Sequence, residues 1–151
     1  MFVSYSRKDE TEKDELLAHL RVLQKGAELI EVWSDDEIAG GEAWMAAVDK
    51  AMLRARVAIL LVTANFLSSD FILKQEVPSL LKRREQDGMR VIPVIAKACA
   101  WKKIGWLSEM NVRPKHGRAV WGTSGSLPDE ALATIADEIA AMVANEPDAE
   151  I

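Results

Sequence analysis

Glu76 is the residue in this sequence with the clearest capacity for chemistry. In a helical register its neighbours one turn earlier are Ile72 and Leu73, and those one turn later are Ser79 and Leu80. A solvated helical Glu usually has a Lys or Arg three or four residues away, and this one has none. A carboxylate among apolar neighbours, shortly after a strand-like run, suits a catalytic role. The alternative is a surface Glu at the edge of a helix.

Other catalytic patterns are missing from the sequence. There is no G-x-G-x-x-G after the first strand and no Walker loop, which argues against hydride transfer and P-loop chemistry. His19 and His116 have no partner pattern, and His19 falls beside a leucine stripe, which favours a structural role. No nucleophilic triad or metal-ligand spacing occurs, so we predict neither a metal nor a bound cofactor.

The bulk composition describes one globular domain. The chain has 151 residues, of which 49% are apolar and 28% are charged, and this is ordinary for a soluble protein. The net charge of −5 argues against direct binding of nucleic acid or a membrane surface. Cys99 is the only cysteine, which excludes an internal disulfide and fits a reducing cytoplasm. No apolar run approaches the roughly 18 residues of a membrane span.

Short apolar runs alternate with helical patterns along the chain. Strands are expected at residues 2–5, 29–33, 57–62, 90–96 and 118–121. Helices are expected at residues 8–24, 42–56, 69–86 and 128–145, with a shorter one within 101–114. Pro78 should break the third of the long helices near Val77, because proline lacks the backbone N–H that a helix interior needs.

This alternation predicts an α/β fold with a flavodoxin-like, open, parallel five-stranded sheet in the order 2-1-3-4-5 and helices on both faces. Ligands of such sheets bind beyond the carboxyl ends of the strands, at the switch point. Here that point lies between the first and third strands. The loops at residues 4–7, 33–35 and 63–66, together with Glu76, should therefore meet at one edge of the sheet.

Five segments in order resemble the TIR (Toll/interleukin-1 receptor) domain in its bacterial form. They are residues 2–6 (FVSYS), residues 32–44 (VWSDDEIAGGEAW), residues 59–76, residues 92–95 with Trp101, and residues 117–120 followed by 129–132. The second of these is similar to the second strand and BB loop of the family. Each segment is a weak signal by itself, but their order over almost the whole chain is specific.

The resemblance implies a domain that cleaves NAD⁺, its substrate, at the nicotinamide–ribose bond. The product would be ADP-ribose or a cyclic ADP-ribose isomer, and the catalytic glutamate of the family falls on Glu76. One position departs from the pattern: many members carry Trp four residues before this glutamate, whereas here Ile72 holds that position and Phe71 lies five before. The role of the aromatic residue therefore stays open.

The resemblance also implies partners and a cellular setting. We expect an effector of bacterial anti-phage defence that is cytoplasmic and is activated by self-assembly into a homo-oligomer or filament of TIR domains. A sensor domain would be fused to it or associated with it. The TIR domain is expected at residues 1–145, and residues 146–151 read as the start of a linker or a disordered tail.

Four residues that leave the first strand are candidate ligands of the substrate, namely Ser4, Tyr5, Ser6 and Arg7. Their hydroxyls and cation could face ribose or phosphate. The alternative is that Ser6 caps the first helix and Arg7 is solvated. The sequence leaves the two alternatives equal.

The remaining candidates for substrate binding are Trp33, Asp35, Trp44, Ser69 and Asp70. The two indoles could stack on nicotinamide or adenine, or they could pack in the core and over a strand edge. Ser69 and Asp70 could touch the ribose, although capping of the helix that carries Glu76 is favoured. Asp35 belongs to an acidic loop that is either solvated or shapes the site.

Three other functions compete with NAD⁺ cleavage as interpretations of this sequence. The first is a non-enzymatic TIR scaffold that signals by homotypic contacts, and it stays open. A response-regulator receiver is rejected, because the third strand ends in Val62 and Thr63 where the phosphoryl-accepting Asp would stand. A nucleoside deoxyribosyltransferase also uses a glutamate, but the segment at residues 32–44 argues against it.

Overall fold

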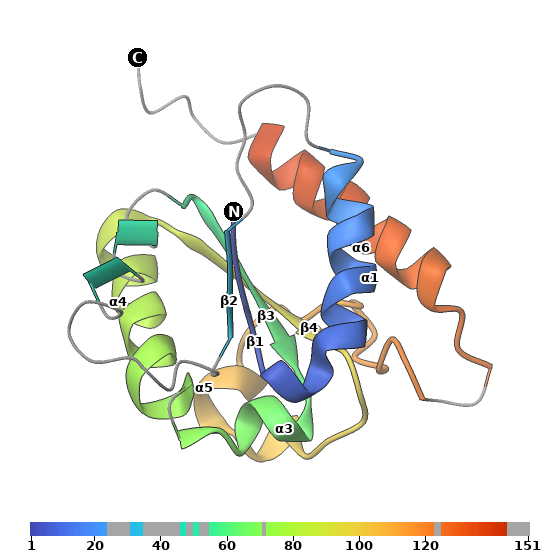
Figure 1. Cartoon of the computed structure of the whole chain (residues 1–151), viewed down its shortest axis with the longest axis horizontal. Coiled ribbons are helices and arrows are strands. Elements are labelled where there is room, and N and C mark those ends of the chain that lie inside the picture. Colours follow the sequence, from blue (N-terminus) through green and yellow to red (C-terminus); the bar gives the residue numbers. More distant parts are fainter. Residues whose placement is uncertain are drawn as a thin grey trace.

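Four parallel strands form one sheet in the part of the chain that the computed structural model describes, which comprises residues 1–23, 31–34, 46–47, 50–51, 55–70, 72–122 and 125–144. The strands are β1 (Phe2–Tyr5), β2 (Glu31–Ser34), β3 (Val57–Val62) and β4 (Arg90–Ile95), and their order is β2-β1-β3-β4 (Figure 1). This confirms the flavodoxin-like order for the first four predicted strands.

The described residues do not show the fifth strand that is predicted at residues 118–121, although the backbone N–H groups of Val120 and Trp121 donate to the carbonyls of Ile95 and Ala96 at 2.9 Å. A single parallel bridge joins Trp121 to Lys97 beyond the end of β4. Gly117 and Gly122, on either side, have φ values of 80° and 83° and turn the chain away. The edge of β4 is also shared with Arg113, whose backbone N–H donates to the carbonyl of Pro93 at 2.8 Å.

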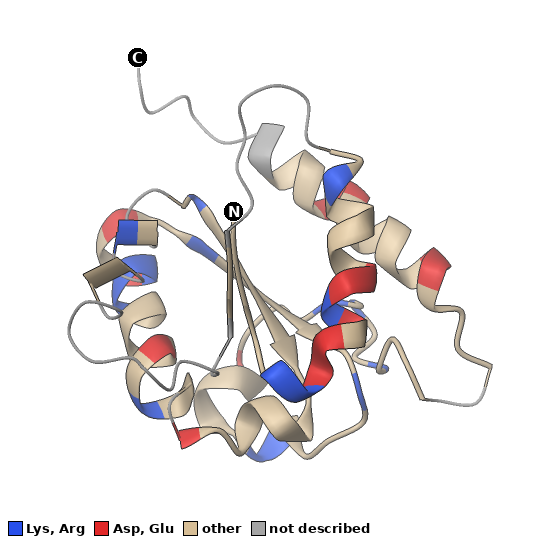
Figure 2. Cartoon of the chain, in the orientation of Figure 1, with Lys and Arg blue, Asp and Glu red and all other residues tan. Residues whose placement is uncertain are grey.

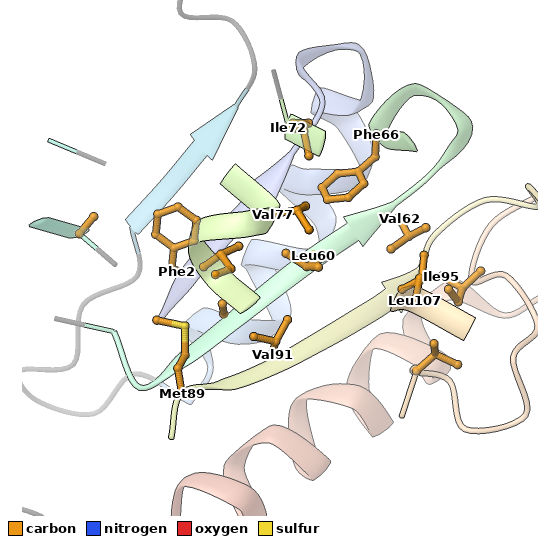
Figure 3. Close-up of a cluster of buried hydrophobic side chains, with 14 of the residues drawn as sticks. Phe2, Leu60, Val62, Phe66, Ile72, Val77, Met89, Val91, Ile95 and Leu107 are labelled. Atoms are coloured by element: carbon orange, nitrogen blue, oxygen red, sulfur yellow. The ribbon is translucent and has the colours of Figure 1, made fainter. Parts of the chain in front are cut away.

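β3 divides the core into two layers because all its residues are apolar and buried on both sides. Ala58, Leu60 and Val62 point to one face of the sheet, where they pack with Phe2 and Phe66. Figure 3 shows this layer beneath the helix that carries Val77. The intervening residues of β3 point to the opposite face.

The helices separate between these two faces (Figure 1). α1 (Glu10–Arg21) and α6 (Pro128–Ala144) cover one face, with Leu16 and Leu20 of α1 buried against Ile135 and Ile139 of α6 in one cluster. α4 (Val77–Asp87) covers the other face, together with the short helices α3 (Ala64–Leu67) and α5 (Gly105–Ser108). The chain also forms two single 3₁₀ turns, η1 (Arg7–Asp9) and η3 (Trp101–Lys103).

One predicted helix and one predicted domain boundary fall wholly or largely outside the described residues. Of the helix expected at residues 42–56, residues 46–47 and 50–51 are helical and most others lie outside the described residues. The boundary expected at residue 145 also lies outside them. No helix among the described residues is long and apolar enough to cross a bilayer.

Pro78 changes the type of helix, as its position predicts. Residues Ile72–Glu76 form a π-helical turn, η2, and α4 begins directly after it at Val77. In a continuous α-helix the nitrogen of Pro78 would have to donate to the carbonyl of Lys74, and proline has no such hydrogen. Short π-helical turns within helices occur frequently at functional sites.

One buried carboxylate joins three segments at the carboxyl edge of the sheet. Asp9, at the end of η1, is fully buried and accepts hydrogen bonds from the hydroxyl of Thr63 and from Nδ2 of Asn65 at 3.1 Å. Nζ of Lys97, just beyond β4, lies 3.1 Å from the same carboxylate. Burial lowers the pKa of Lys97, but the hydrogen bond and charge of Asp9 outweigh it and raise that pKa overall.

The Asp9 carboxylate thereby positions α3. Thr63 is the N-cap of α3, where its Oγ1 accepts a hydrogen bond from the backbone N–H of Phe66 at 3.0 Å while its hydroxyl donates to Asp9. α3 leads directly into η2, which carries Glu76. The segment that joins β3 to η2 is therefore held at its start against the turn after β1.

We predict that Leu60→Ala lowers the free energy of unfolding by about 3 kcal/mol, because Leu60 is fully buried in the central strand and its truncation leaves a cavity. Urea denaturation measures the change. Val22→Ala is the matched control, since Val22 is 73% exposed and its truncation should cost under about 0.5 kcal/mol. Equal effects of the two substitutions would contradict the assigned core.

We predict that Asp9→Ala lowers the free energy of unfolding by about 3 kcal/mol, because it leaves a cation and two polar side chains without their carboxylate. The control is Asp14→Ala, which removes an exposed carboxylate 2.7 Å from Lys13 and should cost under about 1 kcal/mol. Denaturation curves of both variants give the comparison. A loss for Asp9→Ala no greater than for the control would show that the network does not hold this edge.

Candidate functional site

Glu76 is fully buried, although its side chain is polar and it lies on a helix at the surface of the fold. It is the last residue of η2, and its buried neighbours along that stripe are Ile72, Val77 and Leu80. Lys74 and the residue after it are exposed. The carboxylate therefore points toward the sheet, so the alternative of a surface Glu at a helix edge does not describe it.

The position of Glu76 follows from the two labelled residues that flank it in Figure 3. Ile72 lies near Phe66 at the carboxyl end of β3, and Val77 lies over Leu60. Glu76 falls between them in the chain, on the face of the sheet that α4 covers. It is therefore close to the carboxyl edge, where ligands of this fold class bind.

Ser4 and Trp33 share this face of the sheet with Glu76. They are register partners on β1 and β2, and Ser4 pairs with Leu60 on its other side. Since side chains two apart on a strand point the same way, Ser4 lies on the face of Phe2. The Phe2 and Trp33 rings stack with centroids 6.5 Å apart and planes 13° apart. The structure thus gathers two predicted site residues into the layer of Glu76.

The hydroxyl of Ser4 is buried and has no hydrogen-bond partner among the described residues. Leaving such a group unsatisfied costs about 1–3 kcal/mol, and native proteins rarely retain one without a reason. A substrate hydroxyl or amide would satisfy it. Ser4 is therefore the strongest of the predicted binding residues.

Tyr5 and its neighbours lie apart from this layer. Tyr5 points to the opposite face of the sheet, where its hydroxyl donates to Oε2 of Glu10 at 2.8 Å and Nζ of Lys13 lies 5.2 Å from the ring centroid. Burial lowers the pKa of Lys13, but hydrogen bonds to Asp14 and Glu10 raise it to about 12. The sheet therefore separates Tyr5 from Glu76.

Two serines of the predicted site act as helix caps. Ser6 accepts a hydrogen bond from the backbone N–H of Lys8 at 3.3 Å and so caps η1. Ser69 accepts one from the backbone N–H of Ile72 at 3.3 Å, which caps the start of η2. The capping alternative is thus realised for both.

The other predicted binding residues are exposed or undescribed. Arg7 and Asp70 are exposed. Asp35 and Trp44 lie outside the described residues. Of the nine predicted binding residues, the structure places Ser4 and Trp33 in the layer of Glu76.

Sequence reasoning missed Asp9, Thr63, Asn65 and Lys97. Each follows the carboxyl end of β1, β3 or β4 within a few residues, and this shared position was a signal that polar side chains would converge. The contact between Asp9 and Lys97 could not be predicted from the sequence, because the two residues are 88 positions apart. Their role in the fold is to hold the edge that carries the site.

Two other kinds of chemistry find little support among the described residues. No group of three His, Cys, Asp or Glu side chains is arranged there to hold a metal ion. Cys99 is half-buried, and burial raises the pKa of its thiol, which makes the nucleophilic thiolate scarce near neutral pH. Glu76 therefore remains the best-placed reactive group.

Comparison with known proteins agrees with this geometry. A family model described as the TIR domain matches residues 1–121. An uncharacterized protein, y4lF, of Sinorhizobium fredii (strain NBRC 101917 / NGR234) is 31% identical over 139 residues. The match covers 92% of this chain and 42% of that protein, so the chain spans less than half of its relative's length. On the extent of the family match, this chain belongs to the TIR domain family.

Proposed function

We propose that this TIR domain is an NAD⁺ nucleosidase that cleaves the nicotinamide–ribose bond, with Glu76 as its catalytic residue. The observation that carries the proposal is the fully buried Glu76 carboxylate, placed near the carboxyl edge on the sheet face shared by Ser4 and Trp33. The buried hydroxyl of Ser4, which has no hydrogen-bond partner among the described residues, costs stability, and native proteins rarely retain such a group without a reason.

One carboxylate is sufficient for this reaction. Most glycosidases need a second carboxyl group to protonate the leaving oxygen. The nicotinamide of NAD⁺ is already cationic and departs as a neutral molecule, so no general acid is required. As the bond breaks, positive charge moves to the ribose, where the anion of Glu76 stabilises the oxocarbenium-like state.

The fate of the ribosyl cation decides the product. If water attacks, the products are ADP-ribose, nicotinamide and a proton. If a group of the adenosine moiety attacks, the product is a cyclic isomer and no water is consumed. In either case we assign Ser4 to hydrogen-bonding of the substrate and Trp33 to a wall of the pocket, where an aromatic face can stack on a planar base.

We further propose that the domain acts in bacterial anti-phage defence and is activated by self-assembly. This rests on membership of the TIR domain family and on the partial coverage of the relative, which leaves room for a sensor in a longer polypeptide.

We predict that Glu76→Gln lowers NAD⁺ turnover at least about 100-fold, because the amide keeps the shape of the side chain but cannot stabilise the ribosyl cation. Chromatography of the products after incubation with NAD⁺ measures the loss. Glu85→Gln is the matched control, since Glu85 is an exposed residue of α4, and it should retain full activity.

The folded state of Glu76→Gln should keep most of the wild-type stability, because the amide has nearly the same size and shape as the carboxyl group that it replaces. Its unfolding curve therefore separates lost catalysis from lost folding. Full turnover by Glu76→Gln would refute the assigned role. Failure of the wild-type domain to release nicotinamide in any assembled form would favour the non-enzymatic scaffold instead.

We predict that turnover per domain rises with protein concentration, because assembly completes the pocket. Nicotinamide release should be measured across roughly a 100-fold range of concentration, with sedimentation of the same samples to report the assembled fraction. Activity and assembled fraction should rise together. Equal turnover per domain in dilute monomer and in assembled protein would contradict activation by assembly.

A further inference from the structure

A hollow of about 520 Å³ lies between α6 and the segment of residues 114–120. Two of its lining residues, Val120 and Ile135, belong to the apolar layer beneath α1 and α6. Glu76 lies on the opposite face of the sheet, under α4. This hollow is therefore separate from the proposed catalytic site, and nothing in the proposed reaction uses it.

One wall of the hollow is basic. Lys115, His116 and Arg118 lie on one turn and are all exposed. The turn is packed in place, because a Cβ added at Gly117 would approach the ring of Trp101 to 3.3 Å. The backbone of the turn that carries these cationic side chains is therefore held in place by packing against Trp101.

The nearby carboxylate neutralises only part of this wall. Glu138 of α6 already has one oxygen 2.9 Å from Nε of Arg113 and the other 3.3 Å from Nζ of Lys115. Arg118 has no ion pair among the residues that the structure describes. α6 carries four acidic residues and no Lys or Arg, whereas α1 carries both signs of charge (Figure 2). The cationic turn therefore lies beside an acidic helix in a chain with net charge −5.

His116 adds an oriented donor. The backbone N–H of Arg118 donates to Nδ1 of His116 at 3.0 Å, so Nδ1 is the acceptor. The neutral ring then carries its proton on Nε2, which is free to donate to an anion. Arg118 supplies a forked guanidinium two residues away, the geometry that suits phosphate.

The base of the hollow is apolar. An acidic residue in its lining also disfavours a ligand with more than one anionic group. Val120 and Ile135 are buried at the base, and Leu127 at the rim is 62% exposed. Glu130, in the first turn of α6, also lines the hollow and would repel a second anionic group. The volume lies within the range of about 300–1,000 Å³ seen for small-molecule sites and is much larger than an inorganic ion needs.

We propose that this hollow binds a small organic phosphate, with the phosphate held by Arg118 and His116 and an apolar body resting against Leu127 and Ala131. The proposal does not depend on NAD⁺ cleavage. A ligand bound in the hollow would contact both α6 and the turn at residues 114–120, which lies beside the edge of β4. The chemistry required of the ligand is one phosphate monoester on an aromatic or heterocyclic body.

The test is a titration of the full 151-residue chain with phenyl phosphate, followed by amide resonances in ¹H–¹⁵N NMR spectra. The amides of Gly117, Ala119 and Ile135 should shift in a saturable way, with an affinity in the millimolar range that a ligand of this size allows. Inorganic phosphate should bind about tenfold more weakly because it lacks the apolar body. Benzyl alcohol, which has the ring without the charge, should give no saturable shift.

Three variants make the test specific. Arg118→Glu should weaken binding of phenyl phosphate at least about tenfold, and Glu130→Gln should strengthen it by removing a repelling charge. Arg84→Glu, an exposed change of the same kind on α4, should leave the affinity unchanged. The proposal is overturned by an absence of saturable shifts up to about 20 mM ligand. It is equally overturned by wild-type affinity in Arg118→Glu or by equal binding of benzyl alcohol.

Discussion

The carboxylate of Asp9 accepts hydrogen bonds from segments that leave the sheet after β3 and β4, while Asp9 itself belongs to the turn after β1. The carboxyl ends of parallel strands all lie at one edge of the sheet. The polar groups of the loops that follow the strands converge at this edge and are not hydrogen-bonded in the regular pattern of a sheet. A single buried anion with neutral donors and one cation satisfies them together. Every element that carries the candidate site begins or ends at this edge.

The same arrangement explains why the catalytic candidate lies in an apolar layer. α4 must cover the face of β3 with apolar side chains, so a residue on its inner stripe is buried whatever its type. Glu76 occupies that stripe one residue before α4 begins, and Pro78 imposes the change from π to α geometry at that point. Ser4 enters the layer in the same way, from a strand that is otherwise apolar there.

The two faces of the sheet thus offer different chemistry. The α4 face holds a buried acid and a hydroxyl near the carboxyl edge, which suits a reaction that develops positive charge on a sugar. The α6 face holds a hollow with a cationic turn, which suits an anion. β3 is buried on both sides and lies between the two faces. Side chains packed on one face are therefore linked to those on the other face through the backbone of this strand.

The sequence by itself determined the elements whose periodicity is strong and local: the apolar strand at Val57–Val62, the leucine stripe of α1, the break before Pro78 and the identity of Glu76 as the unusual acid. Only the tertiary structure decided what depends on distant partners. It put Tyr5 on the face away from Glu76 and replaced the predicted fifth strand with a single bridge, because Arg113 competes for the edge of β4. It also paired Asp9 with Lys97. The alternation of side chains along a strand and the spacing of side chains along a helix depend on only a few neighbouring residues. The register of one segment against another depends on the packing of the whole chain.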